Sequence, residues 1–374
     1  MTERTKEIRT IRWGILATGW ISSMFVGDLL AERADAPVNH IVTALGTSSQ
    51  NKGVAFVEKV WKDSPSPRPR IYDNYESVYA DPNVDVVYIG TPHSLHRPNC
   101  LAAIAAGKHV LCEKPFAINE LEAQDIVDAA KKKGVYIMEA VWTRFFPLVK
   151  SLQDHLQVHR SIGQVQRFFI DFATKMPLAD LPADSRLKDP SLGAGALLDI
   201  GIYALMYASL VMAPGNLGND HPTPKVLSML NVAEGIDDRD VIILDYAADK
   251  EAGLERRTAI CTTTLNFKGS ETFARVEGSE GTITISGISP SCPGKFTIVK
   301  TASSPDKKPA EELFEFKTPP GTFGFIYEAD AVALDIAAGR TGSDVMPLDE
   351  TLRMMRLMDG IRKENGLIYT QDSI

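Results

Sequence analysis

Short apolar runs alternate with helical patterns from residue 11 to residue 140, and this alternation restricts the possible folds more than any other feature of the chain. The runs have the length of strands and lie at Ile11–Leu16, His40–Gly46, Val84–Gly90, His109–Cys112 and Val135–Ala140. Helical patterns separate them, for example at Pro98–Ala106 and Glu120–Lys133. Strands that are apolar on both faces and joined by helices form a parallel sheet covered by helices. This half of the chain is therefore predicted to be an α/β domain.

The periodicity changes after Pro147. A helix at Leu148–Val158 is followed by segments in which apolar and polar residues alternate, at Val165–Thr174, Lys225–Ala233, Val241–Tyr246, Thr258–Phe267 and Phe273–Ile285. Polar turns such as Glu277–Gly281 and Ser303–Lys308 join some of the strands. This pattern predicts a mainly antiparallel sheet with one packed face and one open face. Because a large open apolar face marks an association surface, we expect a homodimer that forms through this sheet.

The composition restricts the class of partner. A chain of 374 residues, 44% of them apolar, is long enough for two domains with separate cores. Its net charge of -8 argues against nucleic acid or an anionic membrane as the main partner, since either favours clustered Lys and Arg. A small-molecule partner fits this charge better. No apolar run approaches the roughly 20 residues that span a bilayer, and the polar start of the chain lacks the apolar core of a signal peptide, so we expect a cytoplasmic protein. The four cysteines lack the Cys-x-x-Cys spacing of zinc and redox sites, which favours reduced thiols.

The turn after the first strand resembles a nucleotide-binding fingerprint. Ala17, Gly19 and Ser22 occupy the three small-residue positions of G-x-G-x-x-G, where the backbone approaches a pyrophosphate at a helix N-terminus. The segment expected to contact a dinucleotide comprises Ala17, Thr18, Gly19, Trp20 and Ile21. Only the middle glycine of the fingerprint is present, and the alternative is an ordinary turn between a strand and a helix.

The residues after the second strand indicate which dinucleotide is bound. The fingerprint normally requires an acidic residue here for the ribose hydroxyls, and none is present. The chain instead offers Thr47, Ser48, Ser49 and Lys52. Without a carboxylate to repel a 2′-phosphate, NADP is favoured over NAD. Lys52 or Arg68 of a proline-rich loop would supply the positive charge, although a solvated linker is the preferred interpretation of that loop.

Two histidines follow the strand Val84–Gly90, in the segment Thr91, Pro92, His93, Ser94, Leu95, His96. Metal ligation is one interpretation, but no nearby carboxylate or third histidine completes a ligand set, so no metal is expected. The alternative is that Thr91, Pro92, His93 and His96 line a cofactor crevice at the carboxyl end of the strand.

Lys114 and Tyr203 are the candidate reactive residues. Lys114 lies with Glu113 at the end of the strand starting at His109, where a parallel sheet binds ligands, and the alternative is a surface charge pair. Asp199 and Tyr203 are four residues apart in an apolar helical stretch and therefore share one face. For these two the alternative is a buried Asp and Tyr that only hydrogen-bond to each other.

Taken together, these residues resemble the Gfo/Idh/MocA oxidoreductase family over nearly the whole chain, from Trp13 to Tyr369. The most specific marks are Glu113-Lys114-Pro115 and the segments Thr91–His96, Met138–Pro147 and Gly195–Tyr203. Most members carry histidine where this chain has Tyr203. With tyrosine there, the chain resembles the branch that contains dimeric dihydrodiol dehydrogenases and fungal NADP-dependent D-xylose 1-dehydrogenases. Ala17 in place of the first glycine, and the absence of arginine in Thr47–Ser49, depart from the family pattern.

The resemblance implies a Rossmann domain over residues 1–147 and a substrate-binding and oligomerisation domain with an open-faced sheet over residues 148–374. It implies that Lys114 and Tyr203 form a catalytic pair, with Asp199 orienting Lys114 or the sugar. Tyr203 would accept the proton of an anomeric hydroxyl during hydride transfer, because a neighbouring ammonium can lower the tyrosine pKa by about 1 to 3. The product would be an aldonolactone.

The other residues implied by the resemblance lie around the nicotinamide and the substrate. Trp142 and Arg144 would lie near the nicotinamide, and the substrate pocket would contain Trp142, Phe172, Asp199, Tyr203 and Phe323. These aromatic side chains suit an aromatic substrate as well as a sugar. One alternative is therefore oxidation of a trans-dihydrodiol or reduction of a dicarbonyl with the same pair. A separate alternative is that the fold serves as a non-catalytic regulator that senses nucleotides.

Overall fold

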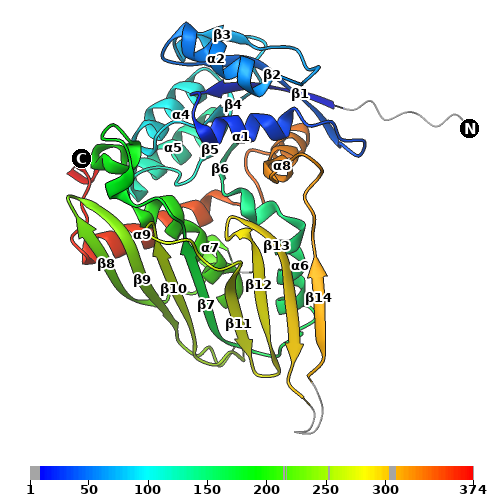
Figure 1. Cartoon of the computed structure of the whole chain (residues 1–374), viewed down its shortest axis with the longest axis vertical. Helices are drawn as coiled ribbons and strands as arrows, with labels where there is room; N and C mark the ends of the chain where they lie inside the picture. The colour runs from blue at the N-terminus through cyan, green and yellow to red at the C-terminus, as the bar shows by residue number, and fades with distance from the viewer. Residues whose placement is uncertain (1–8, 214, 216, 252, 303–308, 374) are drawn as a thin grey trace, which may run out of the picture. The chain divides into compact units, whose positions relative to one another are not determined.

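The computed structural model describes residues 9–213, 215, 217–251, 253–302 and 309–373. The chain divides into two compact units, whose elements are labelled in Figure 1. The first unit contains the residues up to Phe116 together with Gln124–Trp142 and Thr318–Leu348. The second contains Ala117–Ala123, Thr143–Lys317 and the residues from Asp349 onward.

A six-stranded parallel sheet forms the centre of the first unit. Its strands are β1 (Arg9–Leu16), β2 (Val38–Gly46), β3 (Arg70–Tyr72), β4 (Val86–Ile89), β5 (His109–Glu113) and β6 (Ile137–Ala140). They lie in the order β3-β2-β1-β4-β5-β6, which confirms the predicted Rossmann fold. The direction of winding reverses between β1 and β4, and sheets of this type bind ligands outside the strand ends at that reversal.

The first unit also contains helices, which, apart from α8, connect these strands. They are α1 (Trp20–Leu29), α2 (Gln50–Val60), α3 (Glu76–Ala80), η1 (His93–Leu95), α4 (His96–Ala105), α5 (Glu120–Lys133) and α8 (Phe325–Ala337). Gly107 follows α4 with a φ of +77°, a left-handed conformation that suits the predicted end of this helix. The first turn of α5 is grouped with the second unit.

Helix α8 belongs to the first unit although it follows the second sheet in sequence. The Asp28 carboxylate in α1 accepts hydrogen bonds from the backbone N–H groups of Phe323 (2.9 Å) and Gly324 (2.8 Å). The Phe325 ring then packs edge-on against Phe25. The single boundary expected after Pro147 did not anticipate this, because the amphipathic pattern of α8 does not reveal which sheet the helix packs on.

The second unit is built on an eight-stranded sheet. Its strands are β7 (Val165–Ala173), β8 (Lys225–Ala233), β9 (Ile236–Tyr246), β10 (Arg257–Thr264), β11 (Thr272–Gly278), β12 (Gly281–Ser289), β13 (Cys292–Lys300) and β14 (Glu311–Glu315). They lie in the order β14-β13-β12-β11-β7-β10-β9-β8. Only β7 and β10 pair in parallel, which confirms a mainly antiparallel sheet. The turn predicted at Ser303–Lys308 lies outside the described residues.

Helices cover one face of this sheet. They are α6 (Pro147–Gln157), η6 (Leu197–Gly201), α7 (Ile202–Met212) and α9 (Leu348–Glu364), with short turns η2 (Trp142–Phe145), η3 (Leu178–Asp180), η4 (Arg186–Lys188), η5 (Pro190–Leu192), η7 (Gly218–Asp220) and η8 (Thr370–Ser373). Every residue of α7 is buried, and the helix packs on β7 and β10 (Figure 1). The stretch Pro190–Met212 is apolar and long enough to cross a membrane, but its apolar window lies wholly inside this core.

Candidate active site

The turn after β1 has the geometry of a dinucleotide-binding turn despite its missing glycine. Ala17 adopts a φ of +71°, the left-handed region that normally favours glycine. Gly19 precedes the first residue of α1. A Cβ atom on Gly90 would lie 2.4 Å from the Oγ of the buried Ser22, so α1 approaches β4 as closely as the fingerprint requires. The φ of Ala17 and the close approach at Gly90 favour the fingerprint over an ordinary turn.

A cavity of about 650 Å³ opens beside this turn. Its lining residues are Ala17, Thr18, Gly19, Trp20, Ser23, Thr47, Ser48, Lys52, Ala55, Phe56, Lys59 and Tyr75. Lys52 Nζ lies 3.2 Å from Ser48 Oγ. Of the residues predicted for this region, Ile21 and Ser49 do not line the cavity. Ser49 instead caps α2, where its hydroxyl accepts the Lys52 N–H (3.4 Å).

Lys59 and Tyr75 are lining residues that the sequence interpretation missed. Lys59 follows Lys52 by two helical turns, so both lysines lie on one face of α2. That spacing is visible in the sequence once α2 is recognised. Tyr75 comes from the loop before α3 and has no comparable signal.

His93 and His96 lie at the carboxyl end of β4, as predicted. The ring of His96 lies between two carbonyl oxygens, with Nδ1 2.8 Å from Pro115 O and Nε2 2.9 Å from Thr91 O. Both histidines are buried, and their ring centroids are 5.8 Å apart. Within the described ranges, no group of three or more His, Cys, Asp or Glu side chains is arranged to hold a metal ion. His96 therefore joins the loop after β4 to the Lys-Pro turn after β5.

Lys114 follows β5 in a backbone segment that is held on both sides. The buried Glu113 carboxylate accepts the Tyr88 hydroxyl (2.6 Å) and the Lys114 N–H (3.3 Å). After the cis peptide bond to Pro115, the Phe116 N–H donates to Glu139 Oε1 (3.0 Å). Lys114 is itself half-buried. Because Glu113 is buried, the alternative of a solvated surface charge pair does not describe this segment.

Asp199 and Tyr203 lie at the start of the buried helix in the second unit. A π-helical turn, η6, carries Asp199 and leads directly into α7, which carries Tyr203. Arg186 Nη2 donates to Asp199 Oδ1 (3.1 Å). The Tyr203 ring packs beside Phe172, with centroids 5.6 Å apart. Phe172, Asp199 and Tyr203 thus lie in one unit. Arg186 was missed by the sequence interpretation, because it lies in the short turn η4, which carries no motif.

The remaining predicted residues have clear partners. The Trp142 ring stacks on the Phe325 ring, with centroids 4.0 Å apart. Phe323, just before α8, is 46% exposed. In the second unit, Arg144 is buried and its Nη1 lies 3.3 Å from Glu350 Oε1. This contact gives Arg144 a structural partner that the sequence did not indicate. Its place near the nicotinamide stays a prediction.

Burial raises the pKa of Glu350, but the hydrogen bond from Arg353 and the charges of Arg144 and Arg353 outweigh burial and lower the pKa to about 2. The Glu350 carboxylate also accepts hydrogen bonds from the Ser209 hydroxyl (3.1 Å) and the Gly218 N–H (2.9 Å). Glu350 therefore stays ionised and holds two arginines near the end of α7.

The predicted residues divide between the two units. The cofactor turn, Lys114, Trp142 and Phe323 belong to the first unit, and Arg144, Phe172, Asp199 and Tyr203 belong to the second. The pairing of Lys114 with Tyr203 stays a prediction.

Comparisons with known proteins agree with this architecture. Residues 11–141 match the Gfo/Idh/MocA family model, described as an oxidoreductase family with an NAD-binding Rossmann fold. The chain is 32% identical over 373 residues to the D-xylose 1-dehydrogenase (NADP(+)) of Hypocrea jecorina, covering 97% of this chain and 94% of that protein. It is also 32% identical over 369 residues to the trans-1,2-dihydrobenzene-1,2-diol dehydrogenase of Danio rerio, covering 97% and 99% of the two chains.

Solved structures share the fold. A 3-ketoreductase from Actinomadura kijaniata, in complex with NADP, matches with a TM-score of 0.76 at 21% identity over 95% of this chain and 98% of that chain. An aldose-aldose oxidoreductase from Caulobacter crescentus matches with a TM-score of 0.75 at 23% identity over 96% and 98%. With its parallel sheet of reversed winding, its mainly antiparallel second sheet and its full-length relatives, the chain belongs to the Gfo/Idh/MocA oxidoreductase family.

Proposed function

We propose that this protein oxidises an aldose, D-xylose in the first instance, at C1 to the aldonolactone with NADP as the hydride acceptor. The observation that carries the proposal is the presence of Lys114 after β5 and Tyr203 on α7 in a chain related over its full length to an NADP-dependent D-xylose 1-dehydrogenase. The fixed backbone around Lys114 and the Asp199–Arg186 ion pair support it.

Tyr203 acts as the acid/base in this proposal. A phenol with an ordinary pKa of about 10 is a poor base at neutral pH, and a neighbouring ammonium lowers that pKa. Lys114 supplies this charge and holds the C1 oxygen while Tyr203 accepts the hydroxyl proton. Asp199, fixed by Arg186, orients the sugar or Lys114. The nicotinamide, when bound, accepts the C1 hydrogen as hydride, which leaves a C1 carbonyl in the lactone.

The cavity beside α1 fits the adenosine end of NADP. It is lined by two lysines and hydroxyl side chains, and its lining contains no carboxylate. A pyrophosphate would lie at the turn of Ala17 and Gly19, and the 2′-phosphate near Ser48, Lys52 and Lys59.

We expect the double substitution of Lys52→Ala and Lys59→Ala to raise the KM for NADP by about 10- to 100-fold, because hydrogen bonds to charged groups contribute about 1.5 to 3 kcal/mol. The KM for NAD, which lacks the 2′-phosphate, should not change. Steady-state kinetics with both cofactors measures this. Lys62→Ala is the matched control, since Lys62 is exposed just after α2 and does not line the cavity. Equal changes in the two KM values would contradict the assignment.

The second candidate function is oxidation of a trans-dihydrodiol, or reduction of a dicarbonyl, with the same residues. The similarity to trans-1,2-dihydrobenzene-1,2-diol dehydrogenases and the exposed Phe323 ring favour it. A panel of aldoses, a trans-dihydrodiol and a dicarbonyl, assayed with NADP(H) and NAD(H) in parallel, separates the two. The highest kcat/KM for an aldose supports the first proposal, and the highest for the diol supports the second. If the protein turns over none of these substrates, a non-catalytic regulator that senses nucleotides becomes the favoured function.

We further propose that the open face of the second sheet forms a homodimer. Leu227 and Met229 on β8 are exposed, and Met229 pairs with the exposed Val241 on β9. An apolar patch at one edge of an open sheet favours association with a second copy.

Met229→Lys should therefore convert the dimer to a monomer at micromolar concentration, because it places a charge in the centre of the patch. Light scattering measures the mass of each form. Ile288→Lys is the control, since Ile288 is 85% exposed on β12, away from β8 and β9 in the sheet order. A wild-type protein that is monomeric under these conditions would overturn the proposal. A cytoplasmic location stays a prediction.

A further inference from the structure

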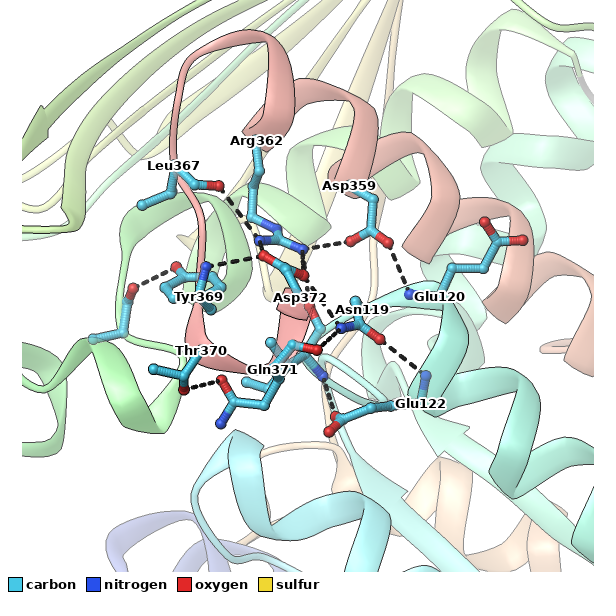
Figure 2. A network of polar contacts seen from close by, with 12 residues as sticks. Asn119, Glu120, Glu122, Asp359, Arg362, Leu367, Tyr369, Thr370, Gln371 and Asp372 are labelled. Carbon is cyan, nitrogen blue, oxygen red and sulfur yellow. Dashed lines mark hydrogen bonds and ion pairs between the residues drawn. The ribbon is translucent and has the colours of Figure 1, made fainter. Parts of the chain in front are cut away.

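A buried arginine organises the C-terminal end of the second unit. Arg362 in α9 is 0% exposed. Its guanidinium donates to Asp359 Oδ1 (2.6 Å) and to Asp372 Oδ2 (2.7 Å), as Figure 2 shows. It also stacks over the Tyr369 ring at 4.8 Å. The last described residues of the chain are therefore fixed to α9 by a neutralised internal charge.

This network continues into the segment Ala117–Ala123, which follows Lys114 in sequence. Asn119 Nδ2 donates to Gln371 O (3.0 Å) and Asp372 Oδ1 (3.2 Å), and Arg362 Nη2 donates to Ile118 O (3.3 Å). The Glu120 N–H donates to Asp359 Oδ2 (2.9 Å). Asn119 also caps α5 through the Glu122 N–H (2.9 Å; Figure 2). The segment Ala117–Ala123 is thus held by α9 through its backbone at Ile118 and Glu120, and by the C-terminal tail through the Asn119 side chain.

The same tail reaches the turn that precedes Asp199 and Tyr203. The Tyr369 hydroxyl donates to Ala194 O (2.6 Å). Gly195 fits between Tyr369 and the buried Asp237, since a Cβ atom on it would lie 2.0 Å from Asp237 Oδ1 and 3.1 Å from Tyr369 Oη. Asp237 Oδ2 in turn accepts the N–H of Leu197 (2.6 Å), the first residue of the π-helical turn.

One buried network therefore contacts the segment that follows Lys114 in sequence and the turn that precedes Asp199 and Tyr203. A buried ion pair adds little to stability compared with apolar packing, and its best-attested use is to fix one arrangement of the chain. A displacement of about 1 Å in a reacting group can lower a rate by about 100-fold. Chain segments that adjoin reacting residues need such fixing.

We propose that Tyr369, Asp372 and Arg362 are positioning residues that hold the turn Ala194–Leu197 and the segment Ala117–Ala123 in the arrangement that catalysis requires. The expected fall in kcat rests on the proposed function. The expected loss of local stability in these two segments does not.

Tyr369→Phe and Asp372→Asn test the proposal in the full-length protein. Tyr369→Phe removes only the hydroxyl and keeps the ring on Arg362, and Asp372→Asn weakens the tie between Arg362 and Asn119. We expect kcat to fall by about ten- to 100-fold in each variant, with the KM for NADP unchanged. Hydrogen exchange should become faster in residues 193–203 for Tyr369→Phe, and in residues 117–123 for Asp372→Asn.

Thr370→Val is the matched control, since the exposed Thr370 hydroxyl contacts only the Gln371 side chain among the described residues. It should leave kcat and exchange unchanged. Wild-type exchange in both segments of both variants would overturn the inference. So would a kcat loss that is matched by equally faster exchange throughout the protein, because that pattern shows general destabilisation. If the wild-type protein oxidises no substrate, the proposed function fails, and the exchange measurement still decides the inference.

Discussion

Tyr203→Phe and Lys114→Ala should each lower kcat for aldose oxidation by about 10²- to 10⁴-fold, the range expected for loss of a positioned acid/base group. Phe at position 203 keeps the ring that packs beside Phe172 and removes the hydroxyl group that we propose as the proton acceptor. In the proposed mechanism, Ala at position 114 removes the charge that makes Tyr203 a competent base. NADPH formation with D-xylose measures both variants.

The two residues should act as a unit, so the double variant should lose about as much activity as either single variant. Tyr207→Phe is the matched control, because Tyr207 is fully buried one turn further along α7 and its hydroxyl has no hydrogen-bond partner in the described part of the chain. It should keep wild-type kcat. Turnover near the wild-type rate in Tyr203→Phe or Lys114→Ala would remove that residue from the mechanism.

Glu350→Gln should lower the free energy of unfolding at pH 7 by about 3 kcal/mol. The reason is that folding lowers the pKa of Glu350 from its ordinary value of about 4.3 to about 2, and a pKa difference of one corresponds to about 1.4 kcal/mol. Gln cannot neutralise Arg144 and Arg353, which stay buried or half-buried around it. Because the pKa is lower in the folded state, this stabilisation is complete above the unfolded pKa and is lost as the pH falls from about 4.3 to about 2.

Urea unfolding of the wild type and Glu350→Gln between pH 7 and pH 3 measures this difference. The difference should shrink toward the acid end of that range. Glu364→Gln on the same helix is the control, since Glu364 is exposed and should cost little at any pH. A difference that stays constant with pH would show that the loss comes from packing and not from the charge of Glu350.

Much of the fold follows from sequence periodicity alone. Helix α5 and strand β8 have the predicted bounds, because an amphipathic helix with charged ends and a strand with regular alternation carry strong local signals. Strand β9 begins at Ile236, five residues before the predicted start, since the polar stretch Asp237–Asp240 hides a strand in which Asp237 and Asp240 are buried. Strands β13 and β14 were missed for a similar reason, as their polar residues obscure the alternation.

The candidate site could be predicted only where the chemistry is local. The left-handed φ of Ala17 cannot be inferred from alanine, which rarely adopts it, so the fingerprint looked weaker in sequence than in structure. Lys59 could have been found from the spacing of α2. The Glu350 partner of Arg144 lies 206 residues away, and no local pattern predicts such a pair. The pairing of Lys114 with Tyr203 came from the family resemblance.

The most direct test of the central proposal is the stoichiometry of the reaction with purified protein, D-xylose and NADP. We expect one NADPH and one xylonolactone to form for each D-xylose consumed, with a higher kcat/KM for NADP than for NAD. Formation of NADPH from a trans-dihydrodiol but from no aldose would contradict it, as would equal use of NAD.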